Sequence, residues 1–178
     1  MERRLATILA TDVVGYSRLA EADEEATICA LNACRQIIEK RVAEHRGRVF
    51  GSAGDSTVAE FSSPVEAVRC ALDIQQELEA RNADLPEDRR MRLRMGVNLG
   101  DVIVEGADLL GDGVNVAARL EGLAEPGGIC ISQMARDGVG NKLPLDYEDL
   151  GDQQVKNIAE PVRVYRVQVP AESVMPAD

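Results

Sequence analysis

The strongest structural signal in this sequence lies at residues 5–17, which read LATILATDVVGYS. An apolar run with several β-branched residues is typical of a strand that is covered on both faces. The apolar side chains of this run are Leu5, Ile8, Leu9, Val13 and Val14. We therefore predict a buried strand that ends on Asp12 and turns sharply at Gly15. A carboxylate at the end of such a strand is costly without a partner. Asp12 therefore either binds a hard cation such as Mg²⁺ or Mn²⁺, or it is a solvated or helix-capping acid.

The composition predicts a single domain. The chain has 178 residues, of which 45% are hydrophobic, enough for one sizeable core. We expect residues 1–169 to form this domain and residues 170–178 to form a flexible tail. The formal net charge of -11 disfavours nucleic acids and anionic membrane surfaces as partners. It still allows a nucleotide to bind where a few cations or metals gather.

The sequence indicates a cytoplasmic protein without a membrane segment. No stretch approaches the roughly 20 apolar residues that cross a bilayer, and the charged start MERR leads into the first strand without a signal peptide. The four cysteines form no CxxC pair and are expected to be small buried hydrophobes in a reducing compartment. The single histidine, His45, is expected on the surface near a helix end, which argues against histidine-dependent triads.

The hydrophobic spacing predicts the order β-α-β-β-α-β for the core. After the first strand we expect a helix at 21–45, a hairpin of strands at 48–50 and 56–61, a helix that begins at 63–66, and a loop at 82–90. We then expect a second hairpin of strands at 92–98 and 101–105 around Leu99–Gly100, a glycine-bracketed loop at 106–113, and a third helix at 114–123. A strand at 129–132, a helical turn at 133–138, and closing strands at 147–150 and 162–169 follow. This order predicts an α+β fold with a ferredoxin-like core, in which helices cover one face of an antiparallel sheet, and a C-terminal extension.

This topology brings two acids together. Asp55 lies at the tip of the first hairpin, where an aspartate is also common for purely local reasons. Because the first strand and this hairpin are neighbours in the predicted sheet, the end of the strand lies next to the hairpin turn. Asp12 and Asp55 would then approach one another, and two close carboxylates are best tolerated around a divalent ion. The pair favours a metal site more than either acid does alone.

The third helix carries a second group of polar residues. Asn115 and Arg119 are four residues apart and share one face, among apolar neighbours. In one interpretation Arg119 pairs with a later glutamate, Glu121 or Glu125, and the amide bonds the backbone. In the other, both side chains donate to an anionic ligand. Lys156, in the turn before the last strand, would by itself be a solvated surface charge.

Four segments give the chain a family resemblance over about residues 4–168. They are ATDVVGYS, GRVFGSAGDSTVAEF, RMGVNLGDVIVEGADLLGDGVNVAARLE and VKNIAEPVRVYRV. The third is the most specific, because an acid, a Gly-Asp turn, an asparagine and an arginine recur in it at fixed offsets. With these segments the chain resembles the catalytic domain of class III nucleotidyl cyclases, the adenylate and guanylate cyclases. The resemblance implies cyclisation of ATP to 3′,5′-cyclic AMP with release of pyrophosphate.

The resemblance also implies metal and phosphate ligands. Asp12 and Asp55 match the two aspartates that hold two Mg²⁺ or Mn²⁺ ions per site. The turn after the first strand matches the backbone whose N–H groups hold phosphates. The residues of this turn that we assign to the substrate are Val14, Gly15 and Tyr16.

Four further residues match the part of the site that faces the nucleoside and triphosphate. Asn115 and Arg119 match the pair that orients the ribose and stabilises the transition state. Lys156 matches a lysine that contacts the triphosphate, and Asp108 matches an adenine-reading position that accepts from the exocyclic amine. The resemblance implies a homodimer with shared sites, in which one subunit supplies the metal-binding aspartates and the other supplies these four residues.

One position departs from the family pattern. The base-reading lysine belongs four residues before the second metal aspartate, where this chain has Gly51. The loss of one polar contact to the base would weaken discrimination by about 1–3 kcal/mol without affecting the chemistry at phosphorus. We therefore expect a relaxed base preference, with GTP accepted, or a high KM. The alternatives are a nucleotide-binding regulatory module without turnover, and an RNA-binding ferredoxin-like domain, which the aromatic content of 3% disfavours.

Overall fold

The computed structural model describes residues 2–168. Its strands are β1 (Glu2–Val13), β2 (Arg48–Ala53), β3 (Ser56–Phe61), β4 (Leu93–Glu105), β5 (Asp108–Leu110), β6 (Ile129–Ser132), β7 (Asp146–Gln153) and β8 (Val162–Gln168). Its α-helices are α1 (Tyr16–Ala22), α2 (Glu24–Glu44), α3 (Pro64–Ala83), α4 (Asp112–Leu123) and α5 (Gln133–Val139), with a 3₁₀ turn at Glu87–Arg89. The predicted tail at 170–178 lies outside the described residues.

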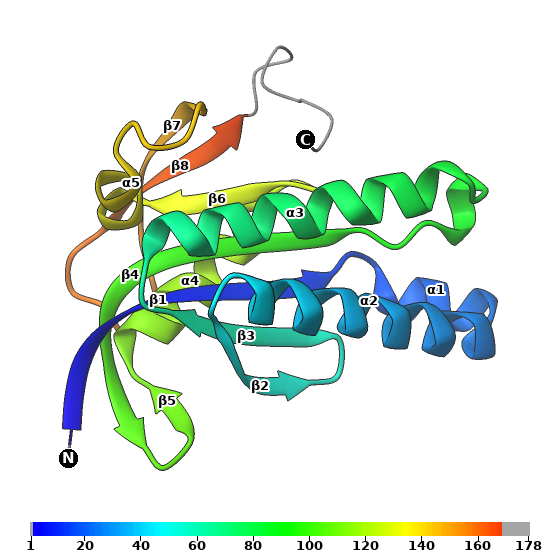
Figure 1. Cartoon of the computed structure of the whole chain (residues 1–178), viewed down its shortest axis with the longest axis horizontal. Helices are drawn as coiled ribbons and strands as arrows, with labels where there is room; N and C mark the ends of the chain where they lie inside the picture. Colours follow the sequence, from blue (N-terminus) through cyan, green and yellow to red (C-terminus); the bar gives the residue numbers. More distant parts are fainter. Residues whose placement is uncertain (1, 169–178) are drawn as a thin grey trace.

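Strand β1 is central to a mixed sheet (Figure 1). The strand order is β2-β3-β1-β4-β6-β8-β7, and β5 pairs with β4. β1 is antiparallel to both β3 and β4, whereas β4 is parallel to β6. The order of the first four strands is that of the ferredoxin-like fold, with α2 and α3 as its two crossover helices. The predicted α+β class and core are confirmed, and β6, β7 and β8 form the C-terminal extension.

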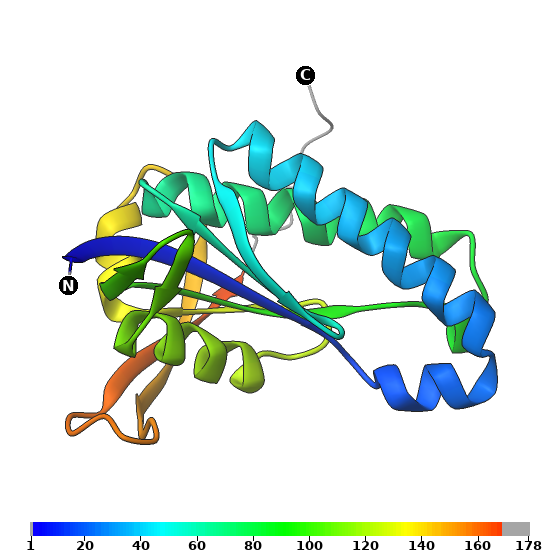
Figure 2. The same ribbon diagram turned by 90° about the horizontal axis from the view of Figure 1, so that it is seen from below.

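The helices cover both faces of the sheet. Figures 1 and 2 show α2 and α3 on one face and α4 on the opposite face. Buried side chains of α2, α3 and α5 share one core cluster, whereas α4 packs into two smaller clusters. The expectation that helices cover only one face is therefore wrong for α4. The helix follows the four-strand core in the chain and crosses the face that this core leaves open.

Both faces of β1 are buried, as its apolar run predicts. Ile8 and Ala10 pack in the cluster that contains Ala117 of α4, whereas Leu9 and Val13 pack in the large cluster under α2 and α3. Leu5 is an exception, since it is 58% exposed. The strand begins at Glu2, and its first residues extend beyond the core.

Several predicted elements have different boundaries in the structure, and the loop expected at 106–113 contains the short strand β5. Two differences change how elements connect. The helix expected at 21–45 is divided at Asp23, whose extended backbone (φ -160°) separates α1 from α2 and whose carboxylate accepts from the N–H of Ala26. The strand expected to turn at Leu99–Gly100 continues to Glu105 as β4, and the turn lies at Gly106 and Ala107. β4 continues because the long β1 provides a partner as far as the Glu2–Val104 pair.

Polar contacts join α2 to α3 at the end of α2. The two ring nitrogens of His45 lie 3.0 Å from a carboxylate oxygen of Glu66 and 2.7 Å from one of Asp73. His45 lies at the end of α2 as expected, but its side chain is only 14% exposed and therefore less accessible than predicted. Cys34, Cys70 and Cys130 are buried as predicted, but Cys29 is exposed. None of the helices within residues 2–168 combines the length and apolarity needed to span a bilayer.

Helix α4 makes an unusually close approach to the sheet at Gly96 of β4. A Cβ at Gly96 would overlap the carbonyl oxygen of Ala117 and the backbone nitrogen of Glu121. Backbone atoms cannot move aside as a flexible side chain does, so only glycine allows this packing. The position of α4 over the sheet therefore depends on Gly96.

Substitution of Gly96 should test this packing. We expect Gly96→Ala to lower the free energy of unfolding by about 3 kcal/mol, because the added methyl group forces α4 away from β4. Gly122→Ala is the matched control, since a Cβ at Gly122 has no atom within 4 Å. The control should raise stability by about 0.5 kcal/mol. Urea denaturation monitored by circular dichroism measures both, and equal effects of the two substitutions would contradict the packing.

Candidate active site

Asp12 and Asp55 meet where β1 lies beside the β2–β3 turn. Asp12 lies opposite Ser56 in the antiparallel β1–β3 pairing, and Asp55 immediately precedes Ser56. The Ser56 hydroxyl donates to a carboxylate oxygen of Asp12 at 3.3 Å. Gly54 begins the tight turn with a positive φ of 60°, and Arg35 of α2 donates to its carbonyl oxygen. The turn that carries Asp55 is thus fixed to both the sheet and α2.

The two carboxylates are close enough to interact. Partial burial and the adjacent carboxylate of Asp55 raise the pKa of Asp12, although hydrogen bonds from Ser56 and Val13 oppose the shift. Within residues 2–168 no group of three or more His, Cys, Asp or Glu side chains forms a fuller set of ligands. Two close carboxylates with unbalanced charge fit a divalent cation that takes its remaining ligands from a substrate or from water.

Two charged residues that the sequence reasoning missed lie beside this pair. Arg94 of β4 lies opposite Asp12 in the β1–β4 register, and its Nε donates to the carbonyl oxygen of Ala124 at 2.9 Å. Glu121 of α4 is half-buried, and burial and the carboxylates of Asp12 and Asp55 raise its pKa to about 7, whereas Arg94 opposes the shift. The strand pairing could have indicated Arg94. No sequence signal indicated Glu121, because its place depends on how α4 crosses Gly96.

Asn115 and Arg119 lie on the outer face of α4. Both side chains are exposed, whereas Val116, Ala117 and Leu120 are buried against the sheet. Among the contacts of residues 2–168, neither side chain has a hydrogen bond or an ion pair. The interpretation in which Arg119 pairs with Glu121 or Glu125 is therefore wrong for this chain, and Glu125 instead lies 3.5 Å from Arg166. The arrangement leaves both donors turned outward and available to a ligand or a second chain.

Lys156 is brought to the same helix. Val155 is buried in the cluster that contains Val116 and Leu120 of α4 and the adjacent Ala124, so the turn that carries the exposed Lys156 packs beneath this helix. Within residues 2–168 no hydrogen bond or ion pair joins Lys156 or the outer face of α4 to Asp12 or Asp55. In one chain, the predicted donors therefore make no direct polar contact with the two acids.

The turn after β1 has one N–H group already in use. The N–H of Val14 donates to the carbonyl oxygen of Arg92 at 2.9 Å. Gly15 adopts the left-handed conformation (φ 64°) and begins α1, whose first N–H groups have no side-chain cap within the described residues. The N–H groups of Gly15, Tyr16 and Ser17 remain in this turn as donors for an anion.

The predicted base-reading positions lie on two strands, β2 and β5, that do not pair with each other in the sheet. Asp108 is exposed at the start of β5, and one of its carboxylate oxygens accepts from the N–H of Leu109 at 2.9 Å. Gly51 lies in β2, next to an irregularity in the β2–β3 register. A Cβ at Gly51 would lie 2.9 Å from Cγ2 of Val58, so a side chain at this position would require Val58 to move.

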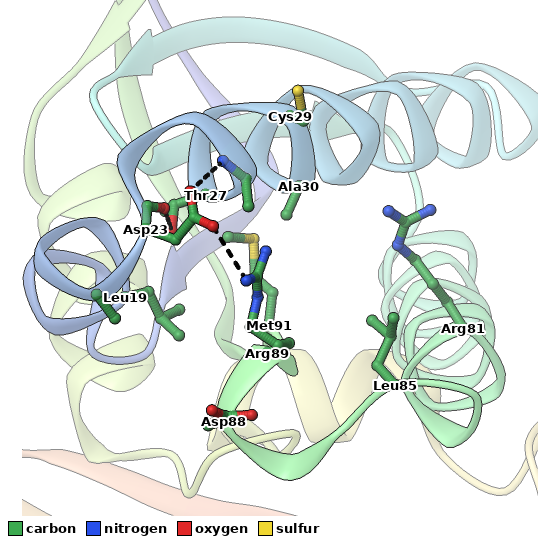
Figure 3. Close-up of a pocket in the computed structure, with 12 residues that line it drawn as sticks. Leu19, Asp23, Thr27, Cys29, Ala30, Arg81, Leu85, Asp88, Arg89 and Met91 are labelled. Atoms are coloured by element: carbon green, nitrogen blue, oxygen red, sulfur yellow. Dashed lines mark hydrogen bonds and ion pairs between the residues drawn. The ribbon is translucent and has the colours of Figure 1, made fainter.

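A separate pocket of about 280 Å³ lies between the α1–α2 junction and the loop that precedes β4 (Figure 3). Its wall includes Leu19, Leu85 and Met91. The carboxylate of Asp23 and the guanidinium of Arg89 point toward one another at 3.2 Å. None of the predicted site residues lines this pocket. The acid pair is thus not part of this pocket.

Comparison with known proteins identifies the family. Residues 2–168 match the family of the adenylate and guanylate cyclase catalytic domain, and the chain belongs to this family. The predicted family is therefore confirmed. Over 166 residues the chain is 52% identical to a protein named putative adenylate cyclase 3 from Rhizobium meliloti (strain 1021). The match covers 93% of this chain and 28% of that relative, so the chain spans about a quarter of its length.

Solved structures agree with this assignment. The crystal structure of an adenylate/guanylate cyclase/hydrolase from Silicibacter pomeroyi has a TM-score of 0.87 at 42% identity, and the match covers 93% of this chain and 96% of that chain. The guanylate cyclase domain of RhGC from Catenaria anguillulae, solved with GTP, has a TM-score of 0.78 at 18% identity and covers 94% and 98% of the two chains. At that identity the likeness concerns the fold alone.

The raised pKa of Glu121 predicts a pH-dependent stability. In the folded chain this pKa is about 7 rather than its ordinary 4.5, so the unfolded chain loses the proton first as the pH rises. The contribution of Glu121 to the free energy of unfolding therefore falls as the pH rises from about 4.5 to about 7. We expect Glu121→Gln to raise the free energy of unfolding at about pH 8 by about 1 kcal/mol, after allowance for solvent screening.

Urea denaturation in EDTA at about pH 4.5 and about pH 8 measures this effect. The difference between Glu121→Gln and wild type should vanish at the lower pH. Glu79→Gln, at an exposed position of α3, is the control and should differ little from wild type at either pH. A difference for Glu121→Gln that stays constant with pH would contradict the raised pKa.

Proposed function

We propose that this chain is an adenylate cyclase catalytic domain that converts ATP to 3′,5′-cyclic AMP and pyrophosphate in sites shared by two copies. The observation that carries the proposal is the division of charged groups within one chain. Asp12 and Asp55 meet at the end of β1, whereas Asn115 and Arg119 are turned outward on α4. Membership of the cyclase family supports the reaction class, and the name of the relative at 52% identity supports ATP as the substrate.

Asp12 and Asp55 would hold Mg²⁺ or Mn²⁺, two ions per site. The fit rests on the convergence of these two carboxylates at the end of β1, where partial burial and the neighbouring carboxylate of Asp55 raise the pKa of Asp12. When bound, such ions neutralise the triphosphate and lower the pKa of the ribose 3′-hydroxyl, which attacks the α-phosphorus. Arg94, opposite Asp12, adds a positive charge from the same chain for the phosphates. The N–H groups of Tyr16 and Ser17, which follow Gly15, would hold phosphate oxygens.

The partner chain would supply the remaining groups. Arg119 would stabilise the charge that develops at the α-phosphoryl group, and Asn115 would orient the ribose by a hydrogen bond. Lys156 would neutralise the leaving pyrophosphate. These three side chains are exposed on the α4 side of the molecule. Such exposure is required if they are to contact a nucleotide bound by another chain. A two-fold homodimer would then contain two complete sites.

Base selection would rest mainly on Asp108. Its carboxylate can accept a hydrogen bond from the exocyclic amine of adenine, and the glycine at position 51 provides no donor for the base. We propose that ATP is the preferred substrate and that GTP is also accepted. A nucleotide-binding module without turnover is the second candidate, and Gly51 is the observation that favours it. Retention of Asp12, Asp55, Asn115 and Arg119 favours the enzyme.

Turnover of ATP and GTP, each measured in Mg²⁺ and in Mn²⁺, tests the proposal directly. We expect cyclic AMP from ATP and slower formation of cyclic GMP from GTP. Because the one remaining base contact, the hydrogen bond to Asp108, should discriminate by about 1–3 kcal/mol, the ratio of kcat/KM for ATP over GTP should lie between about 5 and about 150. Pyrophosphate release gives an independent measure. Tight nucleotide binding without either cyclic product would support the regulatory module and refute the enzyme.

Mixing of two inactive variants tests the shared site. Asp12→Asn and Asn115→Ala should each be nearly inactive, because each disables one half of every site. In an equal mixture with free subunit exchange, half of the dimers are hybrids and each hybrid has one intact site. Activity should therefore recover to about a quarter of wild type.

A matched mixture provides the control. Asp12→Asn mixed with Asp55→Asn alters the same half of the site in both chains, so no hybrid contains an intact site. This mixture should stay inactive. No recovery in the first mixture, with both variants folded and exchanging subunits, would count against shared sites.

A further inference from the structure

The β2–β3 pairing places Arg48 on the same face of the sheet as Gly51. Arg48 pairs with Glu60 and Gly51 pairs with Val58, and the register shifts between Val49 and Gly51. Glu60 and Val58 are two residues apart on β3 and therefore share a face, so their partners on β2 share it as well. Because position 51 has no side chain, the nearest cation along this face of β2 is Arg48.

The guanidinium of Arg48 reaches from β2 to the β4–β5 turn. Its Nη1 donates to the carbonyl oxygen of Ala107 at 2.7 Å. Ala107 immediately precedes Asp108 and follows Gly106, whose φ is 61°. This hydrogen bond joins β2 to the backbone next to the carboxylate that is proposed to read the base.

The orientation of Arg48 is fixed from its other side by Glu60. Nε and Nη2 of Arg48 lie 2.8 Å and 2.7 Å from one carboxylate oxygen of Glu60, and Nη2 of Arg4 lies 2.7 Å from the other. The Glu60 side chain is only 14% exposed. Burial opposes its ionisation, but the hydrogen bonds and charges of Arg4 and Arg48 outweigh burial and lower the pKa of Glu60. Glu60 is therefore an ionised anchor at neutral pH.

We propose that Arg48 is a positioning residue for base selection: anchored by Glu60, it holds the Ala107–Asp108 backbone in place where position 51 supplies no lysine. The inference rests on the proposed function, because it assigns Asp108 to the base of a bound nucleotide. A fixed carboxylate discriminates between purines better than a mobile one, since its hydrogen bond need not order the turn first.

The geometry requires an arginine. The planar fork of a guanidinium can bond Glu60 with two nitrogens and Ala107 with the third at the same time. A lysine has a single nitrogen on a flexible stem, and it would keep the charge while losing one of the two contacts. Arg48→Lys would thus remove one of the two contacts of this side chain, and Arg48→Ala would remove both.

The experiment compares selectivity in these variants of the full chain. We expect Arg48→Ala to lower the ratio of kcat/KM for ATP over GTP about tenfold, mainly through a higher KM for ATP. The kcat for ATP and the Mn²⁺ dependence should change less than about twofold, because the acid pair and α4 are untouched. Arg48→Lys should give an intermediate ratio. Thermal denaturation checks that each variant is folded.

Arg4→Ala is the matched control. It removes an arginine from Glu60 but leaves the bond from Arg48 to Ala107, so its selectivity should stay within about twofold of wild type. A purely structural role of Arg48 would lower stability and leave the ratio unchanged in Arg48→Ala, and that result would overturn the inference. An equal loss of selectivity in Arg4→Ala, or a wild type without base preference, would also overturn it.

Binding of fluorescent ATP and GTP analogues separates this inference from the proposed reaction. If wild type binds ATP selectively and Arg48→Ala removes the selectivity, the inference holds even when no cyclic product forms. In that case the proposed enzyme fails and the base-reading role stands. If neither analogue binds wild type, both proposals are refuted.

Discussion

The pairing of β1 with its two neighbours determines where the charged groups of this protein lie. The antiparallel register places Asp12 opposite Ser56 on one side and opposite Arg94 on the other. The first pairing brings Asp12 to the turn that carries Asp55, and the second adds a cation beside the two acids. Burial of both faces of β1 makes this register costly to change, because a shift by one residue would exchange the side chains of the two cores. The packing of the core on both faces of β1 thus determines the positions of Asp12 and Asp55.

One face of helix α4 packs against the core, and its polar residues lie on the other face. Close contact at Gly96 lets Ala117 and Leu120 reach the sheet. The same contact brings Glu121 toward the acids and turns Asn115 and Arg119 to the surface. The turn with Lys156 packs under this helix through Val155. The packing of this one helix therefore sets the positions of four charged or polar residues.

Periodicity and turn residues were sufficient to predict the fold class, the central strand and the meeting of Asp12 with Asp55. They were insufficient where tertiary contacts determine the boundaries of an element or the position of a side chain. Asp23 ends α1 and caps α2. β4 continues through Leu99–Gly100 without a turn because it pairs with the long β1. His45 was placed on the surface, although two carboxylates of α3 bind it. Glu121 and the contact between Arg48 and Ala107 were missed because each depends on a crossing of elements that no local pattern encodes. The roles of the predicted site residues remain predictions.

The length of β4 has a geometric consequence. Arg94, beside the acids, is near its start, and Glu105, just before the turn that carries Asp108, is its last residue. At about 3.3 Å per residue, these two positions are roughly 36 Å apart along an extended strand. β4 is paired with β1 from Leu93 to Val104, so the sheet fixes this separation along the strand. The strand thereby sets how far apart the phosphate end of one nucleotide and the base end of another would lie on a single subunit.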